Sequence, residues 1–90
     1  MRTRNGRFKT HAQCVFRELL QARGIAHCAL KGCSAAAASR LYHGIGHPNA
    51  GFVVRAAKQL GRDGRRLVQA WLQDKADGLP VHYKISVLVE

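Results

Sequence analysis

The sequence GCSAAAASRLYHG, from Gly32 to Gly44, predicts a tight turn followed by a short helix. Gly32 can take a positive φ angle without steric cost, and the Ser34 hydroxyl can accept a hydrogen bond from a free N–H of a helical first turn. Ala38 and Leu41 are three residues apart and would face inward, which leaves small and basic side chains on the outer face. A helix with such an outer face can approach another surface closely.

The chain is short and strongly basic. Its 90 residues contain 15 Lys and Arg but only five Asp and Glu, which gives a formal net charge of +10, and 47% of the residues are hydrophobic. This length fits one domain with a modest core and leaves little room for an elaborate catalytic cleft. The charge favours polyanionic partners, and a phosphate backbone is the first surface to consider.

Cysteine usage favours a reduced, cytoplasmic protein. The three cysteines are scattered, form no CxxC pair and follow no apolar secretory segment: Cys14, Cys28 and Cys33. The longest apolar run is only a few residues, so we expect no contact with a membrane interior.

The N-terminal part divides into a basic arm and a first helix. Residues 1–9 lack apolar periodicity and are expected to be a flexible basic arm. Thr10 and Gln13 have the spacing of a capping box, and Gly24 can end the helix in a left-handed conformation. Between them runs an apolar stripe of Val15, Phe16, Leu19 and Leu20.

Four further helices are predicted before residue 78, which gives a helical domain over residues 10–77. A helix of two turns fits residues 25–31, and the helix of Ser34 to His43 follows. Asn49, after Pro48, begins a fourth helix, and Asp63 is expected to cap the fifth. The inner positions of these last two helices are Phe52, Val53, Ala56, Ala57, Leu60, Leu67, Val68, Trp71 and Leu72.

Residues 78–90 have a different period. Val81, Tyr83, Ile85, Val87 and Val89 alternate with other side chains, which is typical of a β-strand. A single strand is not stable alone, and no second strand is predicted, so residues 81–89 are expected to pair with a second copy in a homodimer. The alternative is a segment that lies extended over the helices.

Five short helices with a turn between the second and third resemble the DNA-binding domains of the lambda repressor and Cro family, the Xre-type helix-turn-helix proteins. The interval between Ile25 and Gly32 is shorter than in the family, which makes the second helix nearly one turn short. The segments that carry the resemblance are FRELLQARGI at 16–25, GCSAAAASRLYHG at 32–44, Pro48 and RAAKQLG at 55–61.

The resemblance implies a DNA-binding transcriptional regulator whose helix from Ser34 enters the major groove of double-stranded DNA. Alanines can touch only thymine methyl groups, so direct readout would depend on Arg40 and the serines. The basic arm would follow the minor groove. Carried over by position, the residues facing DNA are Ser34, Ala35, Ala36, Ser39 and Arg40, with His43 near a phosphate. The charge of Arg2, Arg4 and Arg7 makes them further candidates for DNA contacts, and the alternative is that the arm is only a solubilising tail.

Other functions are less well supported. Possible zinc ligands are His27, Cys28, Cys33, His43 and His47, but their spacing is poor for a zinc site. Cys28 and Cys33 are better explained as small buried side chains. The five acids show no metal-binding pattern, so we expect no catalytic residue, metal or cofactor. The remaining basic residues fit a solvated face: Lys31, Arg55, Lys58, Arg62, Arg65 and Arg66. The alternative function is a protein-binding regulatory module, because an alanine-rich helix also suits close helix packing.

Overall fold

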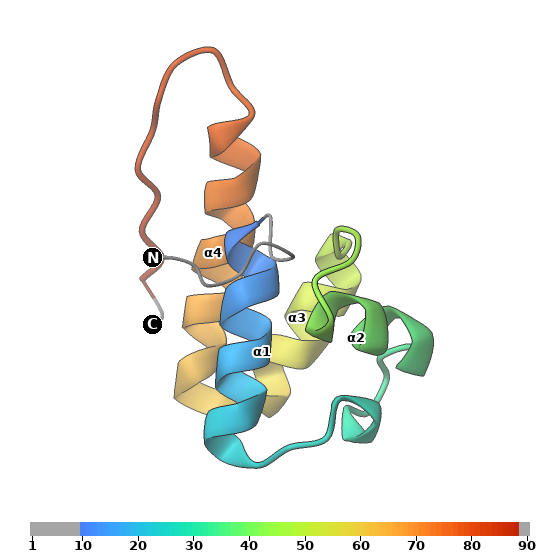
Figure 1. The fold of residues 1–90 in the computed structure, drawn as a ribbon. Coiled ribbons are helices and arrows are strands. Elements are labelled where there is room, and N and C mark those ends of the chain that lie inside the picture. The colour runs from blue at the N-terminus through green and yellow to red at the C-terminus, as the bar shows by residue number, and fades with distance from the viewer. Residues whose placement is uncertain (1–9, 89–90) are drawn as a thin grey trace.

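The structure, a computed structural model, describes residues 10–88, and this part of the chain is mainly helical. The helices α1 and α4 lie side by side and run in opposite directions, while α2 packs against α1 and α3 packs against α4 (Figure 1). None of the described helices is both long and apolar enough to cross a membrane. The elements in order are α1 (His11–Arg23), η1 (His27–Ala29), α2 (Ala35–Tyr42), α3 (Ala50–Gln59), η2 (Gly61–Asp63) and α4 (Gly64–Asp77), where η1 and η2 are 3₁₀ turns.

The ends of α1 form as the sequence predicts. Gln13 N donates to Thr10 Oγ1 at 3.2 Å and Thr10 N donates to Gln13 Oε1 at 3.3 Å, which is a complete capping box. Gly24 ends the helix with φ 65°, where its N–H donates to the carbonyls of Leu20 and Gln21. The capping box at the start of α1 and the left-handed glycine at its end are therefore both local features of the sequence.

One hydrophobic core joins the four helices. The rings of Phe16 and Phe52 meet with centroids 5.7 Å apart and an interplanar angle of 58°. Ala38 and Leu41 of α2 face inward and are buried, as the sequence predicts. The buried side chains of the cluster are Phe16, Leu19, Leu20, Leu30, Ala38, Leu41, Phe52, Val53, Ala56, Leu60 and Leu67.

The helix expected over residues 25–31 is replaced by η1, a single 3₁₀ turn. Ala29 N donates to the carbonyl of Ala26 at 2.9 Å and closes a turn here. The chain leaves α1 through Gly24 and must reach the next turn at Gly32, so too few residues remain to offset the cost of nucleating an α-helix. The described chain therefore has four α-helices rather than the expected five.

The start of α4 also differs from the sequence-based expectation. Asp63 makes no side-chain cap and instead pairs with Arg23, with its Oδ2 3.3 Å from Nη1. Gly64 is buried at the crossing of α3 and α4, where a Cβ atom would overlap the carbonyl oxygen of Ala57. The glycine allows these two helices to approach closely.

The C-terminal segment (residues 79–88) runs back along α4 (Figure 1) and forms no strand within the described chain. Side-chain amides of α4 hold its backbone: Gln73 Nε2 donates to Tyr83 O at 2.7 Å, and Ile85 N donates to Gln73 Oε1 at 2.8 Å. Val87 N donates to Gln69 Oε1 at 3.3 Å. The expected β-strand is therefore replaced, in the single chain, by the extended arrangement that was its alternative.

Candidate nucleic-acid interface

The helix α2 presents a small outer face, as the sequence predicts. Its first turn is capped by Ser34, whose Oγ accepts a hydrogen bond from Ala37 N at 3.3 Å. Ala35 and Ala36 are exposed, whereas Ser39 is half-buried. The Ser34 hydroxyl is already used as the cap of the helix. The guanidinium of Arg40 is therefore the main exposed polar group that α2 offers to a partner.

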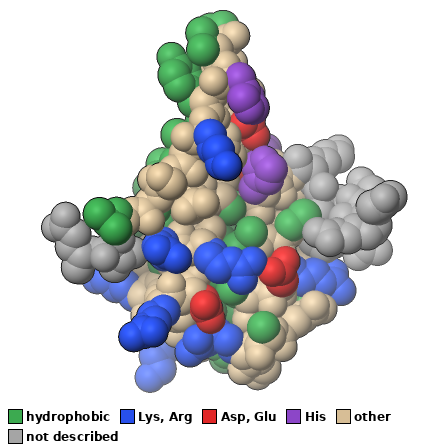
Figure 2. All heavy atoms as spheres, turned by 90° about the vertical axis from the view of Figure 1, so that its left-hand side faces the viewer, with side chains coloured by type: hydrophobic (Ala, Val, Ile, Leu, Met, Phe, Trp, Pro, Cys, Tyr) green, Lys and Arg blue, Asp and Glu red, His purple; other side chains and the backbone are tan. Residues whose placement is uncertain are grey.

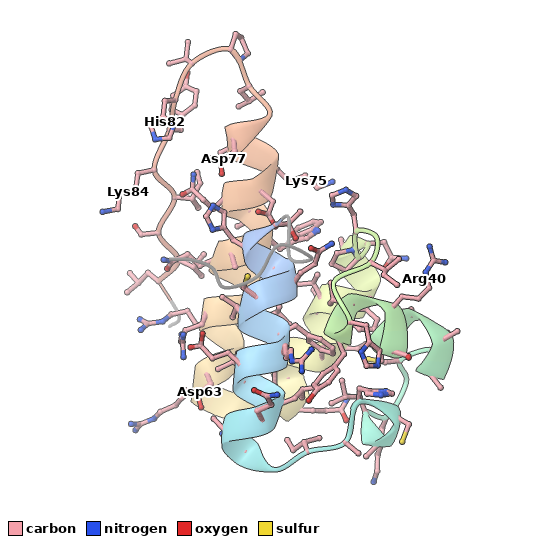
Figure 3. All side chains as sticks on the ribbon, viewed as in Figure 1. Arg40, Asp63, Lys75, Asp77, His82 and Lys84 are labelled. Carbon is pink, nitrogen blue, oxygen red and sulfur yellow. The ribbon has the colours of Figure 1, made fainter. Side chains whose placement is uncertain are left out.

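Arg40 projects outward from α2, on the side of the molecule away from the C-terminal segment (Figure 3). Its Nη2 reaches the loop before α3 and lies 3.6 Å from the point that a Cβ on Gly46 would occupy. The guanidinium lines a shallow hollow between α2 and this loop, together with Ala37, Ile45 and Asn49. The residue with the strongest sequence-based assignment is thus accessible, with a concave surface beside it.

Arg55 of α3 lies close to the turn at Gly32, which precedes α2, and to the start of α3 at Gly51. Its Cδ is 3.1 Å from the point that a Cβ on Gly32 would occupy, and its Nη2 and Nη1 are 3.2 and 3.3 Å from the corresponding point at Gly51. The positive charge of Arg55 also affects the pKa of Cys33, the half-buried residue after Gly32. Burial raises the pKa of the Cys33 thiol, and the positive charge of Arg55 opposes that rise.

Acidic residues are absent from the middle of the sequence, which contains Arg40 and Arg55. Between Glu18 and Asp63 no Asp or Glu occurs, and we call residues 19–62 the acid-free segment. It contains the turn at Gly32, α2 and α3. Its exposed basic residues on these elements are Lys31, Arg40, Arg55 and Lys58.

The acids of the described chain lie elsewhere and have partners. Glu18 pairs with Arg66 at 2.7 Å and Asp63 with Arg23 at 3.3 Å. On the face toward the C-terminal segment, acidic side chains lie among Lys and Arg side chains, and hydrophobic side chains gather at the narrow upper end (Figure 2). The carboxylates of the described residues therefore lie on α1, η2 and α4, whereas α2 and α3 carry none.

An aromatic cluster holds the end of α2. The ring of Tyr42 lies 5.2 Å from that of His27 in η1 and 5.3 Å from that of His43. The guanidinium of Arg17, on α1, lies 5.0 Å from the centroid of Tyr42. These contacts fasten α2 to α1 and η1 where the expected second helix is missing. His43 is exposed but belongs to this cluster.

The arm residues Arg2, Arg4 and Arg7 lie outside the described residues, so their assignment remains a prediction. The same is true of Val89, at the end of the expected strand.

The five side chains considered for zinc form no common group of ligands within residues 10–88, although the rings of His27 and His43 lie 5.8 Å apart. The group of potential metal ligands found in residues 10–88 is instead His11, Asp74 and Asp77, with ligand atoms within 4.8 Å of one another. The sequence did not predict that two of the acids and a histidine lie together here. Both oxygens of Asp74 accept backbone hydrogen bonds, from His11 N at 2.7 Å and from Ala12 N at 2.9 Å. The cluster thus attaches the start of α1 to the end of α4.

Arg55 is the residue of the candidate interface that the sequence-based reasoning assigned only to a solvated face, because a basic residue in a helix is usually only solvated. The signal that identifies it is the pair Gly51 and Arg55, four residues apart on α3. That spacing places a side chain directly below a residue without a Cβ atom.

No protein-family model matches the chain, and neither a curated protein nor a solved structure matches it. The resemblance to helix-turn-helix proteins therefore depends on the sequence segments that carry it.

Proposed function

We propose that this protein binds duplex DNA through α2 and the start of α3 and acts as a transcriptional regulator of the Cro and repressor type. The observation that carries the proposal is the acid-free segment, in which Arg40 of α2 and Arg55 of α3 are both exposed and no carboxylate occurs. Phosphate contacts supply most of the affinity of such an interface. A cytoplasmic location on the nucleoid follows from this function.

Shape supports the same partner. Ala35, Ala36 and Ala37 are exposed and add almost no bulk to α2, so the helix axis can come close to the floor of a major groove. Arg40 is the side chain on this helix that can form paired hydrogen bonds with a guanine edge. We therefore assign most of the direct base readout to Arg40 and expect modest sequence specificity.

Fluorescence anisotropy with labelled duplexes tests this function. Arg40→Ala should narrow the difference in affinity between a selected site and random duplex, because the variant loses a base contact. Arg4→Ala, in the basic arm, should weaken binding to both duplexes equally. If neither substitution changes DNA binding, the assignment of α2 as the recognition helix is wrong.

The rival function, a protein-binding regulatory module, makes a different prediction. Such a protein would show no salt-sensitive binding to a random or a selected duplex, despite its charge of +10. A gel-shift experiment at two salt concentrations separates the two functions.

A further inference from the structure

The position of Arg55 is set by two glycines. A helical side chain leans toward the N-terminus of its helix, so Arg55 extends over the preceding turn of α3. There it meets Gly51, whose missing Cβ leaves room for the guanidinium nitrogens 3.2 and 3.3 Å from the Cβ position. In the turn before α2, the missing Cβ of Gly32 leaves room for Arg55 Cδ, which lies 3.1 Å from that Cβ position. A larger residue at either site would have to displace this side chain.

Among residues 10–88, Arg55 has no anionic partner. Arg23 and Arg66, which lie on α1 and α4, each pair with a carboxylate. Within residues 10–88, the guanidinium of Arg55 takes part in no ion pair and no hydrogen bond, and the residue is exposed. Its five N–H donors are thus free for an external acceptor, and a guanidinium matches the geometry of a phosphate.

We propose that Arg55 binds a DNA phosphate beside the start of α2 and is held ready for it by Gly32 and Gly51. This inference rests on the proposed function and adds a residue that the helix-turn-helix resemblance does not assign to DNA. The phosphate contact fixes how α2 enters the groove, because Arg55 lies next to the turn that precedes the helix. Arg55 then positions the protein while Arg40 reads bases.

The test compares Arg55→Ala with Arg65→Ala, which removes an equal charge from an exposed residue of α4 outside the acid-free segment. Binding to a random 20-base-pair duplex is measured by anisotropy over a range of salt. Arg55→Ala should weaken binding about tenfold and reduce the slope of log K against log [salt] by about 1, since one phosphate contact is lost. Arg65→Ala should change both quantities much less.

The outcomes separate failure of this inference from failure of the proposed function. If the wild-type protein binds DNA and the two variants behave alike, Arg55 is not a phosphate contact. If Arg55→Ala weakens binding but leaves the salt slope unchanged, its partner is not a phosphate. If the wild-type protein shows no salt-dependent binding, the proposed function itself is wrong.

Gly51→Glu provides a second variant that is expected to fold. A glutamate four residues before an arginine on a helix pairs favourably with it, and glutamate has a higher helix propensity than glycine. The variant should therefore be at least as stable as the wild type but bind DNA as weakly as Arg55→Ala. Adding Arg55→Ala to Gly51→Glu should cause little further loss if both act on the same contact.

The chemistry of Cys33 reports the position of Arg55 without DNA. Because the charge of Arg55 opposes the raised pKa of Cys33, Arg55→Ala should raise this pKa further. Alkylation of Cys33 by iodoacetamide, followed by mass spectrometry, should then be slower at pH 8 in the variant. An unchanged rate would place the guanidinium away from Cys33 and contradict the arrangement from which the inference starts.

Discussion

The carboxylate of Asp74, near the end of α4, accepts the backbone N–H of His11, the first residue of α1, at 2.7 Å. Its other oxygen accepts the N–H of Ala12 at 2.9 Å, so one side chain satisfies two free donors at a helix start 62 residues away. A negative charge there also favours the positive end of the helix dipole. Asp74 therefore joins the two ends of the helical domain.

Replacing Asp74 by alanine should destabilise the protein by about 1–2 kcal/mol, the cost of losing a helix cap with charged hydrogen bonds. Asp63→Ala is the matched control, because Asp63 makes only a surface ion pair with Arg23 and should cost at most about 0.5 kcal/mol. Urea denaturation followed by the fluorescence of Trp71 measures both. Equal losses in the two variants would show that Asp74 is not a structural cap.

Gly64 allows α3 and α4 to cross closely, and Gly64→Ala should destabilise the protein by about 3 kcal/mol or more, because the new Cβ overlaps the carbonyl oxygen of Ala57. Gly78→Ala is the control, since a Cβ at Gly78 meets its nearest neighbour, Lys75 O, at an ordinary 3.5 Å. Thermal unfolding followed by circular dichroism compares them. A Gly64→Ala variant as stable as the wild type would contradict the observed helix crossing.

Acid should weaken the contact between α1 and α4 at Asp77. A hydrogen bond from Gln73 lowers the pKa of Asp77 below its ordinary 3.8, and the contact with His11 lowers it further. Because the folded-state pKa is the lower one, the stabilisation by Asp77 is fully present above about pH 4 and is lost as the pH falls through the folded-state pKa. In an NMR titration of the carboxyl group, Gln73→Ala should move the pKa of Asp77 up toward 3.8. A pKa that stays unchanged would assign the shift to another cause.

The sequence predicts a homodimer through residues 81–89, and the docked segment specifies which edge would pair. Tyr83 O, Ile85 N and Val87 N all point to the glutamines of α4, so in an extended chain the backbone groups of His82, Lys84 and Ser86 lie on the opposite edge. Lys84→Pro removes a donor from that outer edge. Analytical ultracentrifugation should show a wild-type dimer and a Lys84→Pro monomer with a similar melting temperature. A monomeric wild-type protein would refute the dimer.

Features fixed by neighbours in sequence were predictable. The capping box of Thr10 and Gln13, the left-handed Gly24 and the inward pair Ala38 and Leu41 each depend on residues within one or two helical turns. Hydrophobic periodicity placed the core of α3 in the same way, since Phe52, Val53 and Ala56 are buried as expected.

Features that depend on distant residues were not predictable. The bonds from His11 and Ala12 to Asp74 span more than 60 positions. The requirement for glycine at residue 64 comes from Ala57 on another helix. The length of η1 follows from the path between α1 and α2 rather than from its own composition. Within the candidate interface, Arg40 belongs to the sequence motif, whereas Arg55 can be identified only from the structure, where Gly32 and Gly51 lie on either side of its side chain.

The central claim, that α2 and the start of α3 bind duplex DNA, is tested most directly by an NMR titration of the ¹⁵N-labelled protein with a short duplex. We expect the amide signals of residues 34–43 and 49–55 to shift most, and those of α4 and the C-terminal segment to shift little. Raising the salt concentration should reverse these shifts, because the contacts release counterions. Shifts concentrated on α4, or no shifts at low salt, would contradict the claim.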